Sequence, residues 1–257
     1  MNILEHKLDE LNSMKNYPSQ IYYDGNLELL DRVKVSIVGS RKTSKYSREQ
    51  THKLSSTLAK AGVCVVSGGA MGVDAVAHLG AGSSNTIAVL PCGINIKYPA
   101  VNKNLLTDIQ NGGLLLSQFE KDDKARPWSF VVRNELVVAL GEVLVVAEAE
   151  LESGSMRSIE FALKMGKEIF VFPHRLGESS ATNELLKEGK AKAIYDIDEF
   201  VSRFGIVGTA QIKQGSFLEY CSTNPTYEEA LKKYPDKVFE AELNGEINIK
   251  NAVIYLV

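Results

Sequence analysis

Three glycines stand close together where an apolar segment runs into a predicted helix. The stretch is Val65-Val-Ser-Gly-Gly-Ala-Met-Gly-Val-Asp-Ala-Val-Ala-His78, and its glycines are Gly68, Gly69 and Gly72. Glycines at the start of a helix let several backbone N–H groups converge on an anion, so this stretch could bind a phosphate. They also form packing turns in which a helix lies close to a strand. The residues leave both interpretations open.

Two other kinds of site fit this region less well. A dinucleotide site needs a G-x-G-x-x-G turn after the first strand, and the turn from Val38 to Tyr46 holds only Gly39. Asp74 and His78 have a spacing that could ligate a metal, but no third ligand is in view. Asp74 is expected to favour the positive end of the helix dipole, and His78 to cap or pack. We therefore predict neither a metal nor a cofactor.

The first turn of the chain carries phosphate-binding chemistry of its own. Gly39 permits a tight turn, Ser40 offers a hydroxyl, and Arg41 can hold two phosphate oxygens at once. Lys42 adds a second cation. The whole span 32–60 holds eight basic residues and one acidic residue, although the chain has a net charge of −3. Local positive charge of this kind attracts a polyanion whatever the total charge is.

Two later segments extend this chemistry. Ser153, Gly154 and Ser155 form another helix entry after a buried strand, and such an entry can hold a phosphate. Between the turns lies a segment that mixes cations, an amide and aromatic rings: Arg126, Trp128, Phe130, Arg133 and Asn134. Cations suit phosphates and aromatic rings stack on bases, which favours single-stranded nucleic acid. Core packing is the alternative for Trp128 and Phe130.

These residues depend on strands and helices that alternate along the chain. The predicted strands are 33–38, 63–66, 86–90, 114–117, 143–147, 168–172 and 193–195. The predicted helices are 47–61, 73–79, 102–111, 130–140, 155–165, 183–188 and 198–203. Short apolar strands between helices predict a doubly wound, mostly parallel α/β sheet that is buried on both faces. Ligands of such sheets bind at the carboxyl ends of the strands, where all the turns above are expected.

The chain divides into four parts. A short N-terminal segment, 1–30, is expected to hold one polar helix and an extended piece, and 31–205 to form the α/β domain that carries the turns above. A polar linker covers 206–215, and 216–257 follow the order helix, helix, helix, hairpin of a small winged-helix domain. A winged helix can bind duplex DNA. Here its third helix holds more acidic than basic residues, which favours contact with a protein instead.

Bulk composition excludes several classes of protein. The chain has 257 residues, of which 44% are hydrophobic and 24% charged, as is typical of globular proteins. No run of about eighteen apolar residues predicts a membrane helix, and the charged N-terminus lacks the apolar core of a signal peptide. Three scattered cysteines form neither a disulfide framework nor a zinc site. We predict a cytoplasmic protein, and the four histidines show no arrangement typical of an enzyme.

Together, these motifs resemble those of the DprA/Smf family of DNA-processing proteins. The matching stretches, in family order, are Val35-Ser-Ile-Val-Gly-Ser-Arg41, Ser67-Gly-Gly-Ala-Met-Gly-Val-Asp74, Pro91-Cys-Gly93, Tyr98-Pro99, Arg133-Asn134, Ser153-Gly-Ser155 and Thr182-Asn183. The resemblance implies an extended Rossmann-like domain that binds single-stranded DNA and forms homodimers. Family members protect incoming strands during natural transformation and help to load the RecA recombinase. By position, Arg41 and the Gly68–Gly69 loop would hold phosphates and Phe130 would contact a base.

Three positions depart from the family pattern. Glu135 stands where the family has an arginine, and Gln118 stands where it has a glutamate. A basic residue of related sequences falls on Pro127, so Arg126 or Lys124 is expected to substitute. The tail resembles the small DML1-like winged-helix domain that many members carry.

The first hypothesis is therefore a non-catalytic protein that binds single-stranded DNA, protects it and helps to load RecA. Expected partners are single-stranded DNA, RecA and a second copy of the chain, with another competence protein as a candidate for the C-terminal domain. The alternative is an enzyme similar to the lysine-decarboxylase-like nucleotide phosphoribohydrolases. Their Pro-Gly-Gly-x-Gly-Thr-x-x-Glu motif corresponds here to Glu150–Ser158, which lacks the Pro-Gly-Gly. A plain nucleotide-binding regulator is the third hypothesis.

Overall fold

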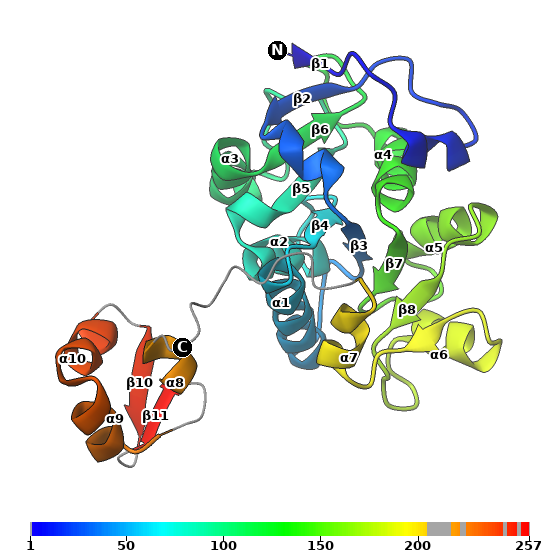
Figure 1. Cartoon of the computed structure of the whole chain (residues 1–257). Helices are drawn as coiled ribbons and strands as arrows, with labels where there is room; N and C mark the ends of the chain where they lie inside the picture. The colour runs from blue at the N-terminus through cyan, green and yellow to red at the C-terminus, as the bar shows by residue number, and fades with distance from the viewer. Residues whose placement is uncertain (1, 205–216, 222–224, 244–245, 251–252, 257) are drawn as a thin grey trace. The chain divides into compact units, whose positions relative to one another are not determined.

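The computed structural model describes residues 2–204, 217–221, 225–243, 246–250 and 253–256. The chain forms two compact units, residues 1–207 and residues 208–257 (Figure 1). The linker predicted over 206–215 lies outside the described residues. None of the described helices combines the length and the apolar character that a membrane span requires.

A nine-stranded sheet forms the centre of the first unit, with the strand order β1-β2-β6-β5-β4-β3-β7-β8-β9. The strands are β1 (Asn2–Ile3), β2 (Tyr22–Gly25), β3 (Lys34–Val38), β4 (Cys64–Ser67), β5 (Thr86–Leu90), β6 (Leu114–Ser117), β7 (Val143–Val146), β8 (Ile169–Val171) and β9 (Lys192–Ala193). All pairs among β3 to β9 are parallel, whereas β2 pairs with β1 and with β6 in antiparallel register. The prediction of a doubly wound, mostly parallel sheet is confirmed.

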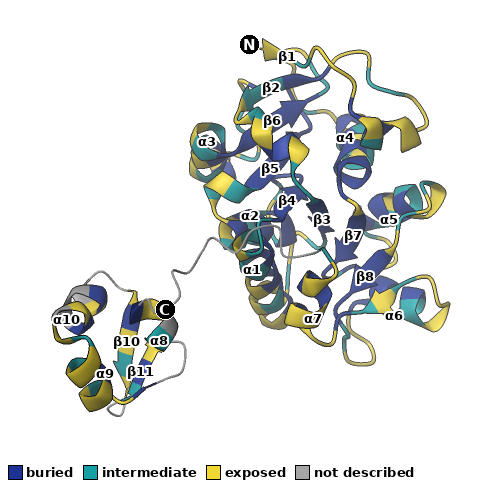
Figure 2. Cartoon of the chain, viewed as in Figure 1, coloured by how far each residue is buried: buried dark blue, intermediate teal, exposed yellow. Residues whose placement is uncertain are grey.

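Helices cover both faces of this sheet, so every residue of β3 to β8 is buried (Figure 2). They are α1 (Lys45–Lys60), α2 (Val73–Ala81), α3 (Lys103–Gly112), α4 (Pro127–Leu140), α5 (Ser155–Lys164), α6 (Ser180–Lys187) and α7 (Ile197–Ser202). Ile37 of β3 packs in one core cluster with Leu54 of α1, and the next residue, Val38, packs in another with Leu136 of α4. The strand order reverses between β3 and β7, so the turns that follow these two strands meet at one edge.

The first thirty residues differ from the prediction. They hold a five-residue 3-10 helix, η1 (Asp9–Ser13), instead of an α-helix, and strands β1 and β2 extend the sheet. Leu8, Leu11 and Met14 are spaced three apart, which suits a 3-10 turn and brings all three into the core beside α4. The segment predicted to precede the domain is therefore packed into the same compact unit. Further 3-10 turns are η2 (Leu27–Asp31), η3 (Ser83–Asn85) and η4 (Ala100–Asn102).

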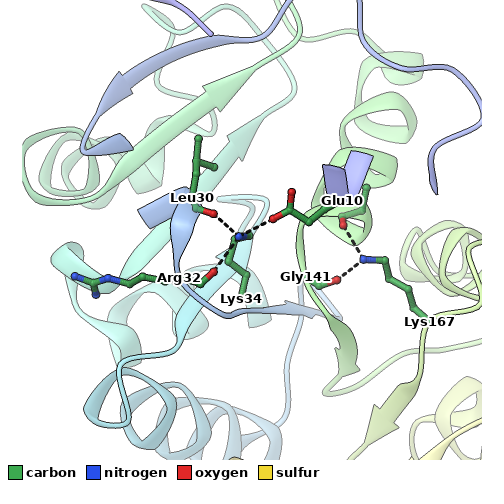
Figure 3. Close-up of polar contacts among 7 residues, drawn as sticks. Glu10, Leu30, Arg32, Lys34, Gly141 and Lys167 are labelled. Atoms are coloured by element: carbon green, nitrogen blue, oxygen red, sulfur yellow. Dashed lines mark hydrogen bonds and ion pairs between the residues drawn. The ribbon is translucent and has the colours of Figure 1, made fainter. Parts of the chain in front are cut away.

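Lys34 ties this N-terminal segment to the sheet, and Lys167 holds the end of α4 nearby (Figure 3). Lys34, at the start of β3, is only 5% exposed, and its Nζ lies 2.8 Å from a carboxylate oxygen of Glu10. The same Nζ donates to the carbonyl oxygens of Leu30 and Arg32. Burial would raise the pKa of Glu10, but hydrogen bonds and nearby lysine charges together outweigh it, so the pKa is lowered. Lys167 donates to the carbonyls of Ala139 and Gly141 at the end of α4. Both lysines lie at the edge of the sheet opposite the predicted site.

The described residues of the second unit form three helices and a hairpin. They are α8 (Phe217–Cys221), α9 (Tyr227–Lys233), α10 (Pro235–Leu243) and the antiparallel strands β10 (Ile247–Lys250) and β11 (Val253–Leu256). Phe217, Val238 and Ile254 belong to its own core cluster. Thr226 and Glu229 form a capping box at the start of α9. The order of elements is the one expected, and the winged-helix assignment stays a prediction.

Candidate nucleic-acid interface

A cavity of about 690 Å³ opens at the carboxyl edge of the sheet, next to β3. This is the edge where the strand order reverses, and ligands of open α/β sheets bind there. Its walls come from the β3–α1 turn, the β7–α5 turn and the first part of α4, together with Ala70, Asp74 and Tyr98. Ten predicted site residues line it: Gly39, Ser40, Arg41, Lys42, Phe130, Arg133, Asn134, Ser153, Gly154 and Ser155. The structure therefore brings together segments more than a hundred residues apart.

The β3–α1 turn presents its cations to solvent and keeps its other polar groups inside. Arg41 and Lys42 are exposed. The Ser40 hydroxyl donates to the carbonyl of Lys42 at 3.0 Å and accepts from its N–H at 3.1 Å. A Cβ on Gly39 would lie 2.6 Å from a methyl of Val73, so only glycine allows this approach. The Ser40 hydroxyl, predicted to face a phosphate, is used within the turn.

An aromatic pair stands beside Arg41. The Arg41 guanidinium carbon lies 5.3 Å from the ring centroid of Phe130, within the range of a cation–π contact. The ring of Tyr98 meets Phe130 edge-on, with centroids 5.8 Å apart, and is 43% exposed. These three side chains also line a second, narrower pocket next to the first. A cation and two rings at the mouth of a cavity can hold a phosphate and a base together.

The glycine loop after β4 turns its polar groups inward. The Asp74 carboxylate accepts the N–H of Ala70 at 3.3 Å, and Asn102 donates to the carbonyls of Gly69 and Ala70, both at 3.0 Å. Gly69 has a φ of +67°, a left-handed conformation that favours glycine. A Cβ on Gly68 would collide with the Arg133 guanidinium. Of the two interpretations left open by the sequence, this geometry favours the packing turn.

Arg133 braces that loop from inside the protein. It is 3% exposed, and its Nη1 donates to the carbonyls of Gly68 and, at 2.7 Å, Val89. Burial lowers the pKa of Arg133, while the nearby Asp74 charge opposes this. Burial in turn raises the pKa of Asp74, and Arg133 opposes that shift. The two opposite charges thus stabilise each other, and the Arg133 Nη1, expected to meet a phosphate, is engaged by backbone carbonyls.

The β7–α5 turn remains open to the cavity. Ser153, Gly154 and Ser155 lead into α5, whose first N–H groups and dipole favour an anion. A Cβ on Gly154 would meet nothing within 4 Å. Arg157, in the first turn of α5, also lines the cavity and pairs with Glu160 at 2.8 Å. Its exposure was not anticipated from the sequence, although its place three residues after Gly154 could have revealed it.

Other predicted residues lie away from the cavity walls. Trp128 is 54% exposed and packs edge-on against Phe119 at 5.7 Å, while Phe130 faces the cavity. Residues two apart on a helix point to nearly opposite sides, which separates these two rings. Arg126, just before α4, is exposed but is not among the residues that line the cavity. Glu135 faces elsewhere, because its carboxylate accepts the N–H of Lys15 at 3.0 Å.

The sequence of the chain is similar to those of known DNA-processing proteins. The model of a family described as DNA recombination-mediator protein A matches residues 6–205. The DNA processing protein DprA of Streptococcus pneumoniae is 34% identical over 76% of this chain and 70% of its own length. Protein Smf of Escherichia coli is 30% identical over 88% of this chain, which spans 61% of that protein.

Solved structures show the same likeness. DNA processing protein A from Helicobacter pylori, whose single-stranded DNA binding mode has been described, superimposes with a TM-score of 0.77 and 41% identity. The match covers 79% of this chain and 94% of that one. DprA of Streptococcus pneumoniae gives a TM-score of 0.72 with 32% identity, over 77% of this chain and 71% of that chain. The resemblance indicated by the motifs is confirmed.

Proposed function

Because the chain belongs to the DNA recombination-mediator protein A family, we propose that it binds single-stranded DNA without catalysing a reaction on it. The observation that carries this proposal is the Arg41 guanidinium against Phe130 at a cavity formed by two strand-to-helix turns. Cations and aromatic rings in one groove suit a strand whose bases are unpaired, because rings stack on bases while cations meet phosphates. The relative from Helicobacter pylori, named for such binding, supports the same substrate class.

Each wall of the cavity has its own part in this proposal. Arg41, Lys42 and the N–H groups at the start of α5 contact phosphates, and Arg157 adds a further cation. Phe130 and Tyr98 stack on bases. The residues that shape the site without reaching the strand are Gly39, Ser40, Gly68, Gly69, Arg133 and Asn134. Arg126 and Trp128 contact nucleotides that extend beyond the cavity along the start of α4.

The wider role follows from the same substrate. We propose that the protein protects incoming single strands in the cytoplasm and helps to load RecA onto them, as a homodimer. The second unit, as a winged-helix domain, contacts a protein partner rather than DNA, since the sequence of its helix α10 holds more acidic than basic residues.

The test is the binding of a fluorescent oligonucleotide by full-length protein, single-stranded beside duplex, over a series of salt concentrations. Arg41→Glu should weaken single-strand binding about a hundredfold, because it removes a phosphate contact and adds a repelling charge. Arg48→Glu is the matched control: it reverses the same charge on the exposed part of α1, outside the cavity walls. Trp128, the single tryptophan, reports base stacking through its fluorescence.

Three outcomes would contradict the proposal. One is equal affinity of the Arg41→Glu variant and the Arg48→Glu control. The second is competition by mononucleotides as strong as that by oligonucleotides, which would indicate a nucleotide-binding regulator. The third is release of free base from a nucleoside monophosphate, which would indicate a phosphoribohydrolase.

A further inference from the structure

One residue outside the cavity holds both ends of the turn that carries Arg41 and Lys42. Glu148 follows β7, and its backbone carbonyl accepts the N–H of Ser40 at 2.8 Å. Its carboxylate oxygen Oε2 accepts the N–H of Ser44 at 2.9 Å and the Ser44 hydroxyl at 2.7 Å. The two cations therefore lie on a short loop that is fastened at Ser40 and at Ser44 by the same residue.

The carboxylate also fixes the start of α1. Ser44 is the N-cap of this helix, and its hydroxyl oxygen accepts the N–H of Ser47 at 3.2 Å. Because the Ser44 hydroxyl donates its proton to Glu148, the cap, the carboxylate and the helix form one hydrogen-bonded chain. A negative charge at this end of a helix is stabilised by the dipole. Burial would raise the pKa of Glu148, but hydrogen bonds from Ser47 and Ser44 outweigh it, so the pKa is lowered and the group stays ionised.

We propose that Glu148 is the positioning residue of the phosphate-binding turn, which it holds from behind in the conformation that presents Arg41 and Lys42 to the DNA strand. Glu148 does not line the cavity, whereas Ser40, Arg41 and Lys42 do. A carboxylate close to a phosphate site would repel the DNA strand if the carboxylate faced that strand. The Glu148 carboxylate is directed instead to Ser44, at the start of α1. This inference rests on the proposed single-stranded DNA binding.

The second unit contains a matched control. Glu229 accepts the N–H of Thr226 at 3.0 Å and the Thr226 hydroxyl at 2.8 Å, and Thr226 is the N-cap of α9. The pKa of Glu229 is lowered by these Thr226 hydrogen bonds. The chemistry is the same as at Glu148, but α9 contributes no residue to the cavity. Glu229→Ala therefore removes the same kind of contact without touching any turn that lines the cavity.

The experiment compares Glu148→Ala, Glu148→Gln and Glu229→Ala with the unaltered protein. Glu148→Ala should bind single-stranded DNA about tenfold more weakly, the cost of losing a charge-assisted hydrogen bond. Glu148→Gln keeps an acceptor for Ser44 and should recover most of the affinity, and Glu229→Ala should bind normally. Ser44→Ala removes the other partner, and combining it with Glu148→Ala should weaken binding no further, since both act on one contact.

Hydrogen exchange provides a readout that needs no DNA. Amides 40–47 should exchange faster in Glu148→Ala and not in Glu229→Ala. If Glu148→Ala binds DNA normally while Arg41→Glu does not, the inference is wrong and the proposed function stands. Equal losses in Glu148→Gln and Glu148→Ala would also overturn it. If the unaltered protein binds no single-stranded DNA, the proposed function fails, whereas the exchange data still report on the turn.

Discussion

Two strand-to-helix turns leave neighbouring strands of the same sheet and use their polar groups in opposite directions. The turn between β3 and α1, residues 39–44, exposes Arg41 and Lys42 to the cavity. The turn between β4 and α2, residues 68–72, directs its groups to Asp74 and Arg133 inside the protein. Both turns are rich in small residues and both look like anion sites in the sequence. The first turn presents its cations outward, and the second is held by charged side chains of the chain itself.

The difference teaches that a turn can meet an anion through the cations that it exposes, because N–H groups of both turns already have internal acceptors. In the second turn, the Asp74 carboxylate accepts the N–H of Ala70, and Asp74 lies in the first turn of α2, where a bound phosphate would otherwise sit. In the first turn, Glu148 accepts the N–H of Ser44, while Arg41 and Lys42 stay exposed. The two turns therefore differ in the charge that they expose rather than in whether a carboxylate holds them.

The largest expected effect comes from removing the internal carboxylate. Asp74→Ala removes the acceptor of the Ala70 N–H and the negative charge nearest in effect to the buried Arg133 guanidinium, and leaving such groups unsatisfied costs about 3 kcal/mol of unfolding free energy. Urea unfolding should measure this loss. Asp108→Ala, at an exposed position on α3, should change stability by less than about 0.5 kcal/mol. Equal stability of the two variants would break the comparison, because the turn after β4 would then not depend on its carboxylate.

Substitutions of two glycines test the difference between the closed and the open turns, with a smaller expected effect on stability. A Cβ on Gly68 would collide with Arg133, so Gly68→Ala should lower the unfolding free energy by about 2 kcal/mol through overpacking. Gly154→Ala adds the same methyl at the β7–α5 turn, where nothing lies within 4 Å, and should leave stability unchanged. Thermal unfolding of both variants gives the comparison directly. A loss of stability in Gly154→Ala that matched the loss in Gly68→Ala would show that the β7–α5 turn is as closely packed as the loop after β4.

The positions of these turns were predictable, and the direction of their polar groups was not. Apolar runs and glycines mark where strands end, and this is a local property of the chain. The partners that decide direction are remote in sequence: Arg133 meets Gly68 across 65 positions, and Ser44 meets Glu148 across 104. The separation of Trp128 from Phe130 could have been predicted, because helical periodicity alone places them on opposite sides. The N-terminal strands were missed because pairing with β6 is another remote contact.

His78, on the helix after the second turn, provides a smaller, pH-dependent test that this turn belongs to the packed interior. Its Nδ1 donates to the Thr86 hydroxyl at 2.7 Å, since that hydroxyl already donates its own proton to Val65. Burial lowers the pKa of His78 from 6.5 to about 3, and the Arg133 charge acts in the same direction. The imidazole is therefore a neutral, packed group, as a structural turn requires.

Protonation of His78 should make the fold less stable in acid. In the unfolded chain this group binds a proton near pH 6.5, whereas in the fold it stays neutral down to about pH 3. Between these values the unfolded state binds more protons. The unfolding free energy therefore decreases as the pH is lowered, by up to about 1.4 kcal/mol per pH unit. His78→Asn keeps a donor for Thr86 and should flatten the pH dependence of urea unfolding between about pH 6 and pH 4. His6→Asn, at an exposed position, should not, and an unchanged slope in His78→Asn would mean that the helix after the second turn is not packed as tightly as the comparison requires.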